Sequence, residues 1–287
     1  MISLDWPAPA KLNLFLHVLG RRADGYHELQ TAYQLIDLAD TLSFALRGDG
    51  EIRRLAGPSS VPAEVDLTVR AARLLRTLGG VSKGAEIRLE KRIPLQGGLG
   101  GGSSDAATTL IALNELWGLH LPVEKLAEAS LSLGADLPLF VHGRSSWGEG
   151  IGERLTPIEL PPRHYVVIFP GVGASTAEVF QASELTRNSP SLTIRAFLQA
   201  GGRNDCAPVA TGRYPEVGRA LAWLAQRGDA RLTGTGSCVF AGFAERAQAE
   251  AAISDLPGEW KGFVARGLDR SPLQERVAAE RARQGQF

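Results

Sequence analysis

The chain has 287 residues, of which 44% are hydrophobic and 22% are charged, values typical of a globular protein. Its 31 basic and 31 acidic residues cancel, and a nucleic-acid partner normally requires a basic excess, so we expect none. No apolar run reaches the roughly 18 residues of a membrane span, and the two cysteines, Cys206 and Cys238, show no metal-ligand spacing. We therefore expect a cytoplasmic protein without disulfides or membrane association.

The first forty residues are predicted to form a hairpin. Residues 10–19 alternate between an apolar face and a face that carries Lys11 and Asn13, and a period of two predicts a strand. Residues 22–25 contain the turn signal Asp-Gly, and residues 26–38 again have extended, apolar-rich character.

Later elements follow from spacing and from glycine or proline stops. The predicted helices cover 64–78, the stretch from the Gly/Ser loop to about 117, 122–133, 215–226 and a final helix after 243, and the predicted strands cover 85–93, 164–169 and both sides of a turn within 232–243. Glycine and proline concentrate between 143 and 165, so we expect two domains, 1–154 and 155–287.

The segment Pro94–Asp105, PLQGGLGGGSSD, lies between a predicted strand and a predicted helix. Its glycines let successive N–H groups point inward and remove the Cβ atoms that would block an anion. The helix N-terminus adds unpaired donors and a partial positive charge. We expect Ser103 and Ser104 to cap the helix or to bind phosphate oxygens, with one of them facing Mg²⁺. The segment is thus predicted to bind a nucleoside triphosphate.

This loop differs from the common phosphate-binding motifs. A P-loop requires GxxxxGK[ST], a Rossmann turn requires GxGxxG directly after a strand, and a protein kinase requires VAIK and HRD motifs. None of these occurs here. The remaining alternative is a glycine-rich structural turn.

PLQGGLGGGSSDAA resembles the central motif of the GHMP kinases, which include galactokinase, homoserine kinase, mevalonate kinase and phosphomevalonate kinase. Four further segments fit the family in order, namely PAKLNLFLHV with DGYHEL at 9–29, LGADLP at 133–138, PGVGASTAEVF at 170–180 and TGTGSCVF at 233–240. The resemblance is greatest to the members that phosphorylate a cytidyl diphosphate derivative of methylerythritol in non-mevalonate isoprenoid biosynthesis. Homoserine kinase, mevalonate kinase and a non-catalytic nucleotide-binding regulator are the alternatives.

The resemblance implies an α+β fold with two domains. The N-terminal domain is expected to be ribosomal-S5-domain-2-like and to bind ATP, and the C-terminal domain is expected to be ferredoxin-like and to lie on the substrate side. ATP is the implied co-substrate with Mg²⁺, whose ligands remain open. The implied assembly is a monomer or a homodimer.

The resemblance also assigns roles to single residues. Asp136 becomes the general base and Lys11 its electrostatic partner, although an N-cap aspartate and a solvated lysine are the simpler interpretations from the residues alone. Asn13 is expected to bind a substrate hydroxyl and Thr176 the nucleotide end of the substrate. The implied ATP-binding residues are Asp66, Lys91, Pro94, Gln96, Gly97, Gly98, Leu99, Gly100, Gly101, Gly102, Ser103 and Ser104.

The remaining assignments concern the cytosine base of the substrate and two positions that differ from the family pattern. Tyr26 and Phe180 are expected to sandwich a cytosine ring while His27 reads its edge, and the simpler interpretation of Phe180 is a core residue. The family usually has a small residue where Gln96 stands and an asparagine where Asp66 stands. The TGTGSCVF turn is expected to stabilise the phosphate loop.

Overall fold

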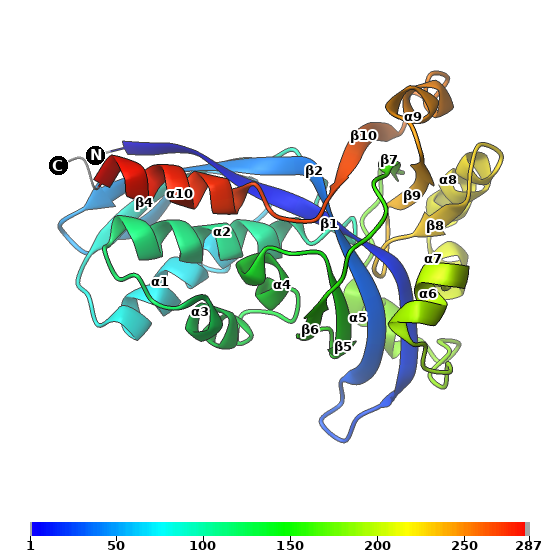
Figure 1. The fold of residues 1–287 in the computed structure, drawn as a ribbon, viewed down its shortest axis with the longest axis horizontal. Coiled ribbons are helices and arrows are strands. Elements are labelled where there is room, and N and C mark those ends of the chain that lie inside the picture. The colour runs from blue at the N-terminus through cyan, green and yellow to red at the C-terminus, as the bar shows by residue number, and fades with distance from the viewer. Residues whose placement is uncertain (1, 285–287) are drawn as a thin grey trace.

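A computed structural model of the chain describes residues 2–284. A long hairpin, made of β1 (Ile2–Arg21) and β2 (His27–Arg47), runs through the whole molecule (Figure 1). The two strands pair antiparallel along their lengths, with register shifts near Pro9 and Asn13. The predicted hairpin is confirmed, with longer strands than expected. Because other elements pack on both sides of β1, both of its faces are buried at 10–18 except for the half-buried Leu14.

On the side away from β1, β2 pairs with three different strands along its length. β5 (Ser146–Gly150) pairs near its start, β10 (Lys261–Leu268) in its middle and β4 (Gly84–Glu90) toward its end. The main path of the sheet runs β3-β4-β2-β10-β7-β9-β8, where β3 is Ile52–Ala56, β7 is His164–Phe169, β8 is Ala230–Leu232 and β9 is Val239–Phe243, while β6 (Arg154–Pro157) pairs with β5. β2 therefore connects both halves of the molecule.

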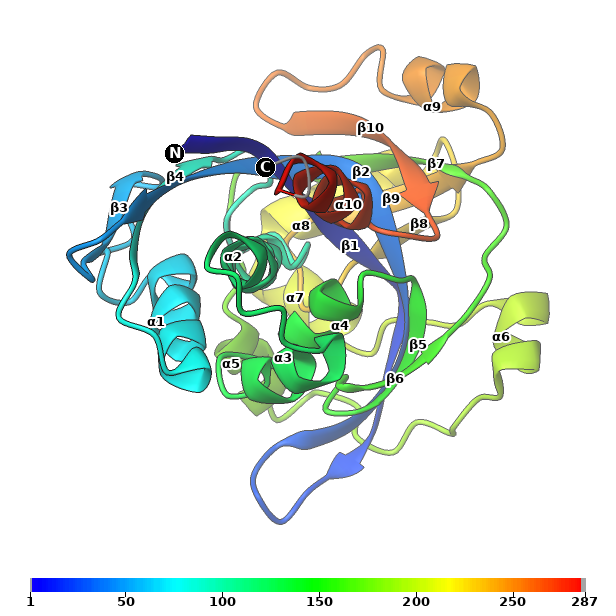
Figure 2. The ribbon, with the colours of Figure 1, turned by 60° about the vertical axis from the view of Figure 1, so that its left-hand side comes forward.

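Four helices cover one side of the N-terminal strands (Figure 2). They are α1 (Leu67–Gly79), α2 (Gly101–Leu116), α3 (Val123–Ser130) and α4 (Leu137–His142). The core between helices and sheet includes Trp6, Phe44, Leu75, Ile87 and Leu113. The final helix, α10 (Leu273–Gln284), returns from the C-terminal half and packs on α2 and β1 (Figure 1).

The helices of the C-terminal half are α5 (Thr176–Gln181), α6 (Ile194–Ala200), α7 (Ala207–Arg213), α8 (Pro215–Ala225) and α9 (Arg246–Ala252). Helices α8 and α9 pack on the β7–β9 strands, whereas α6 packs through Phe197 on Phe15 of β1 and Trp147 of β5. A second core joins Val166 of β7 and Leu224 of α8 to Leu16 and Leu29 from the far end of the hairpin. The hairpin thus contributes to both cores.

Most predicted elements occur, with ends displaced by a few residues. Helix α1 begins at Leu67 because the Asp66 side chain accepts a hydrogen bond from the backbone N–H of Thr68, and it ends at the left-handed Gly80. The prediction of a final helix after 243 was incomplete, because the structure has α9, β10 and α10 there. Within residues 2–284, no helix has both the length and the apolar character needed to cross a membrane.

Candidate active site

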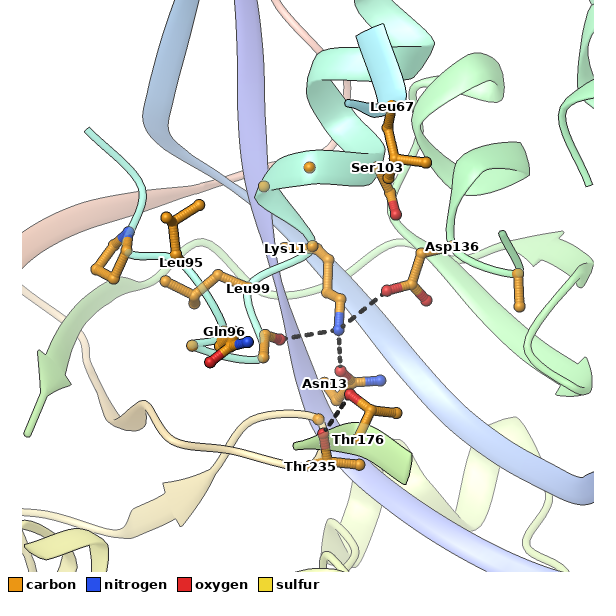
Figure 3. Close-up of a pocket in the computed structure, with 18 of the residues that line it drawn as sticks. Lys11, Asn13, Leu67, Leu95, Gln96, Leu99, Ser103, Asp136, Thr176 and Thr235 are labelled. Carbon is orange, nitrogen blue, oxygen red and sulfur yellow. Dashed lines mark hydrogen bonds and ion pairs between the residues drawn. The ribbon is translucent and has the colours of Figure 1, made fainter. Parts of the chain in front are cut away.

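A cavity of about 710 Å³ opens between the glycine loop, β1 and the start of α4 (Figure 3). The predicted residues that line it are Lys11, Asn13, Lys91, Pro94, Gln96, Gly97, Gly98, Leu99, Gly100, Gly101, Gly102, Ser103, Asp136, Thr176 and Phe180. Four predicted residues, Tyr26, His27, Asp66 and Ser104, are not among the residues that line it. Segments far apart in the chain therefore meet at one cavity.

The glycine loop leads directly into α2. The helix begins at Gly101, and its N-cap is Gly100, which has a φ of 71° and provides no side-chain cap. Of the two roles expected for Ser103 and Ser104, helix capping is wrong, because the helix begins inside the glycine run, and phosphate binding stays a prediction. Ser103 lines the cavity, whereas Ser104 is fully buried, and its Oγ has no hydrogen-bond partner among the described residues.

The turn at 233–238 supports the loop from below. The Cys238 N–H donates to the Gly97 carbonyl at 3.0 Å, and Thr233 Oγ1 donates to the Gly98 carbonyl at 3.3 Å. A Cβ on Gly98 would lie 2.3 Å from the Thr233 carbonyl oxygen, so this close approach requires glycine. Burial raises the pKa of the Cys238 thiol, which keeps it protonated.

Lys11 lies at the centre of the polar groups in the cavity (Figure 3). Its Nζ donates to the Gly98 carbonyl at 2.9 Å and to Asn13 Oδ1 at 2.5 Å, and it lies 3.6 Å from Asp136 Oδ2. The Lys11 side chain is 4% exposed, so the simpler interpretation of a solvated lysine is wrong. Asn13 also donates from Nδ2 to Thr31 Oγ1, which fixes the amide.

Asp136 occupies the N-cap position of α4 without capping it. Its backbone is helical, with φ −81° and ψ −15°, and its side chain makes no capping hydrogen bond. The carboxylate points toward Lys11 instead and stays 32% exposed (Figure 3). The neighbouring Tyr33 also lines the cavity, and burial, followed by the negative charge of Asp136, raises its pKa well above the ordinary value. No motif in the sequence marks Tyr33, which lies within β2.

Lys91 connects the loop to two carboxylates that the sequence analysis did not single out. Its Nζ lies 2.6 Å from Asp40 Oδ2 and 2.9 Å from Asp105 Oδ2. Asp40 Oδ1 accepts the backbone N–H groups of Arg92 and Ile93. Burial lowers the pKa of Lys91, but the two carboxylates more than offset it, so the net pKa is raised. Burial raises the pKa of Asp105 well above its ordinary value, against the opposing effect of Lys91.

The carboxylate of Asp66 contacts protein groups and does not line the cavity. One carboxylate oxygen accepts from the N–H of Thr68, and the other forms an ion pair with Arg54. Its sequence neighbour Leu67 lines the cavity, as does Val61. Both oxygens of Asp66 therefore have partners inside the protein.

Of the predicted base-binding residues Tyr26, His27 and Phe180, one lines the cavity. Phe180 lines the cavity, and the His27 ring stacks against it with centroids 5.1 Å apart and an interplanar angle of 23°. Tyr26 is 59% exposed, and the structure places it outside the cavity. Thr176 Oγ1 lies 3.0 Å from Thr235 Oγ1, at the edge of the same opening.

The protein class is identified by comparing the chain with known protein families. The models of the GHMP kinases N terminal domain and the GHMP kinases C terminal domain match residues 66–144 and 184–262. The chain belongs to the GHMP kinase family, and the predicted two-domain fold of that family is confirmed.

Relatives that are about 55% identical to nearly the whole chain share one enzyme name. A 4-diphosphocytidyl-2-C-methyl-D-erythritol kinase of Alkalilimnicola ehrlichii is 56% identical over 97% of this chain and 96% of its own length. The enzyme of the same name from Halorhodospira halophila is 55% identical over 98% of both chains. A crystal structure of 4-(cytidine 5'-diphospho)-2C-methyl-D-erythritol kinase is 34% identical, with a TM-score of 0.80, over 93% of this chain and 99% of that one.

The sister kinases share the fold alone. A mevalonate kinase structure superposes with a TM-score of 0.66 at 16% identity, over 93% of this chain and 100% of that chain. Homoserine kinase from Cytophaga hutchinsonii gives 0.65 at 16% identity, over 94% of this chain and 95% of that chain. The higher identity and TM-score both favour the cytidyl enzymes.

Proposed function

We propose that this chain transfers the γ-phosphoryl group of ATP to the 2-hydroxyl of 4-diphosphocytidyl-2-C-methyl-D-erythritol. The observation that carries the proposal is the contact between Lys11 and Asp136 at the glycine loop, inside a single cavity. The relatives named above support the choice of substrate.

The glycine loop supplies the phosphate site. Phosphoryl transfer depends mainly on positioning and on neutralising charge at the γ-phosphate. The N-terminus of the 16-residue helix α2 directs unpaired N–H groups toward the loop, and Lys91 lines the same cavity. This end of the cavity is therefore suited to the triphosphate of ATP.

Asp136 takes the proton of the acceptor hydroxyl. As the hydroxyl oxygen bonds to the γ-phosphorus, the bond to the β,γ-bridging oxygen breaks, ADP leaves and the proton moves to the carboxylate. Lys11 lies 3.6 Å from that carboxylate and offsets the charge that develops on the transferred group. Asn13, held by Lys11 and Thr31, orients the hydroxyl.

The residues at the phosphate end fit a magnesium ion that arrives with ATP. Among residues 2–284, no group of three or more acidic, histidine or cysteine side chains is arranged to hold a metal. The Ser103 hydroxyl and the Asp136 carboxylate lie on one side of the cavity (Figure 3). So few protein ligands suit Mg²⁺, which keeps water and phosphate oxygens in its coordination sphere. When bound, the ion neutralises charge on the β- and γ-phosphates.

One assay separates the candidate functions. ATP consumption is measured with the cytidyl substrate, homoserine and mevalonate offered in parallel to the purified chain. We expect turnover with the cytidyl substrate alone. Turnover with homoserine or mevalonate would instead indicate a sister kinase, and ATP binding without turnover on any acceptor would indicate a regulator.

A further inference from the structure

Arg187 lies in the segment that follows α5, and each nitrogen of its guanidinium group has a partner. Its Nη2 donates to the carbonyls of Phe180 at 2.9 Å and Ala182 at 2.7 Å, and its Nη1 donates to the carbonyl of Leu185 at 3.1 Å. Its Nε donates to Nε2 of His27 at 3.1 Å. These bonds fix the planar group, since a guanidinium offers its donors in a rigid fork.

The bond to His27 determines where the imidazole carries its proton. Because the Arg187 Nε–H is a donor, Nε2 of His27 must accept, and the proton of the neutral ring lies on Nδ1. Burial, followed by the positive charges of Arg187 and Arg21, lowers the pKa of His27. Within residues 2–284, the structure gives Nδ1 no hydrogen-bond partner. The ring therefore offers one free donor.

The same guanidinium connects the His27 ring to the backbone of Phe180, whose ring lines the cavity. His27 begins β2 and Phe180 belongs to α5, so the two rings come from different halves of the chain. Their rings stack at 5.1 Å, and Phe180 also lines the cavity. Arg187 bonds to the backbone of Phe180 and to the ring of His27, so it holds both ends of this stack.

We propose that Arg187 is a positioning residue for recognition of the substrate base. It holds Phe180 as a stacking surface and keeps His27 in the tautomer that donates from Nδ1. A cytosine ring offers acceptors at N3 and O2 to such a donor, and it stacks on an aromatic face. This inference rests on the proposed function, because it concerns the cytidyl end of the substrate.

The kinetic test uses Arg187→Met with a matched control. Arg213→Met removes an arginine that is also anchored to the α5 region, through the Glu178 carbonyl and Glu184, but that contacts neither ring. We expect Arg187→Met to raise KM for the cytidyl substrate at least about tenfold, because one hydrogen bond to a charged group is lost. KM for ATP and kcat should be nearly unchanged. Arg187→Lys keeps the charge without the fork and should show a smaller rise.

A second readout follows His27 directly. With ¹⁵N-labelled histidine, and His27→Asn to assign the signal among the five histidines, Nδ1 should be protonated and Nε2 unprotonated in the wild type. In Arg187→Met the Nε2–H tautomer should appear and the pKa of His27 should rise, since a neighbouring positive charge is gone.

The outcomes separate the two proposals. An unchanged KM for the cytidyl substrate in a folded Arg187→Met, or an unchanged His27 tautomer, would overturn the role of Arg187 while leaving the proposed function intact. An equal rise of KM for both substrates would also overturn it, since it would indicate general loosening. A wild-type chain that does not phosphorylate the cytidyl substrate would overturn both.

Discussion

Oδ2 of Asp136 lies 3.6 Å from Nζ of Lys11, across the cavity between the start of α4 and β1. Neither side chain has the role that its local sequence favours, which is a helix cap for Asp136 and a solvated surface residue for Lys11. Asp136 stands at an N-cap position but makes no capping bond, and Lys11 is buried in the middle of a strand. The proposed phosphoryl transfer requires a buried lysine next to a carboxylate that makes no capping bond, both beside a glycine loop.

The first prediction concerns this pair. We expect Asp136→Asn to lower kcat by about 10²–10⁴-fold, the usual contribution of a positioned general base. Lys11→Met should cause a loss of similar order, and the double variant should lose little more than either alone, because the two groups act as a unit. Steady-state kinetics with circular dichroism on the three variants measures this. Additive losses, or near-normal kcat in either folded single variant, would contradict the assignment.

The second prediction concerns Phe180. If its ring stacks on the substrate base, Phe180→Ala should raise KM for the cytidyl substrate by about five- to 150-fold, which corresponds to ~1–3 kcal/mol of stacking. KM for ATP should stay close to the wild-type value, because in this proposal the Phe180 ring contacts the base of the cytidyl substrate and not ATP. Phe180→Leu serves as the control that keeps apolar bulk. Equal effects on both substrates would indicate misfolding instead.

The third prediction concerns the two carboxylates at Lys91. The pKa of Asp105 is raised in the folded protein, so the folded state binds this proton more tightly than the unfolded state does. The contribution of Asp105 to stability is therefore largest below its ordinary pKa of 3.8 and falls as pH rises through the folded-state pKa. Asp105→Asn should remove this decrease, and urea denaturation between about pH 4 and pH 8 measures it.

Asp40→Asn is the matched comparison. Asp40 is fully buried and accepts two backbone N–H groups as well as Lys91, so its loss leaves a buried cation with a weakened partner. We expect it to cost about 3 kcal/mol at neutral pH, whereas Asp105→Asn should cost little or be stabilising. Equal destabilisation by both substitutions would show that Asp105 is ionised and is needed as a counter-charge.

The fourth prediction explains Gln96 at the entrance of the loop. Gln96 has a φ of 54°, unusual for a residue other than glycine, and its side chain fills the space above Gly173. A Cβ on Gly173 would lie 2.9 Å from Gln96 Cβ and 2.4 Å from its Oε1. Gly173→Ala should therefore cost about 1–3 kcal/mol, and adding Gln96→Gly should restore most of the stability. Thermal unfolding of the four proteins in this cycle tests the coupling, and independent, additive effects would contradict it.

Patterns that are local in sequence were sufficient for much of the fold. The alternation at 10–19, the glycine stop after α1 and the strand at 164–169 each depend on neighbouring residues. β10 was missed because its strand contains Gly262 and Gly267 and is largely half-buried, which weakens the period-two signal. Its place in the sheet is set by tertiary pairing with β2 and β7.

The site divides in the same way. The glycine loop, Lys11 and Asp136 belong to motifs that can be recognised in the sequence alone. Asp40, Tyr33 and Arg187 have no such motif, because each gains its partner only when distant segments meet. The position of Asp66 was visible, but its ion pair with Arg54 and its cap on α1 depend on the fold.

The position of the new phosphate ester tests the central claim most directly. In the proposed substrate the 2-carbon carries a methyl group and no hydrogen, whereas the 1- and 3-carbons carry hydrogens. After incubation with ATP, the ³¹P signal of the new monoester should be free of three-bond coupling to protons. A new monoester signal split by one or two protons, or no new monoester at all, would contradict phosphorylation of the 2-hydroxyl.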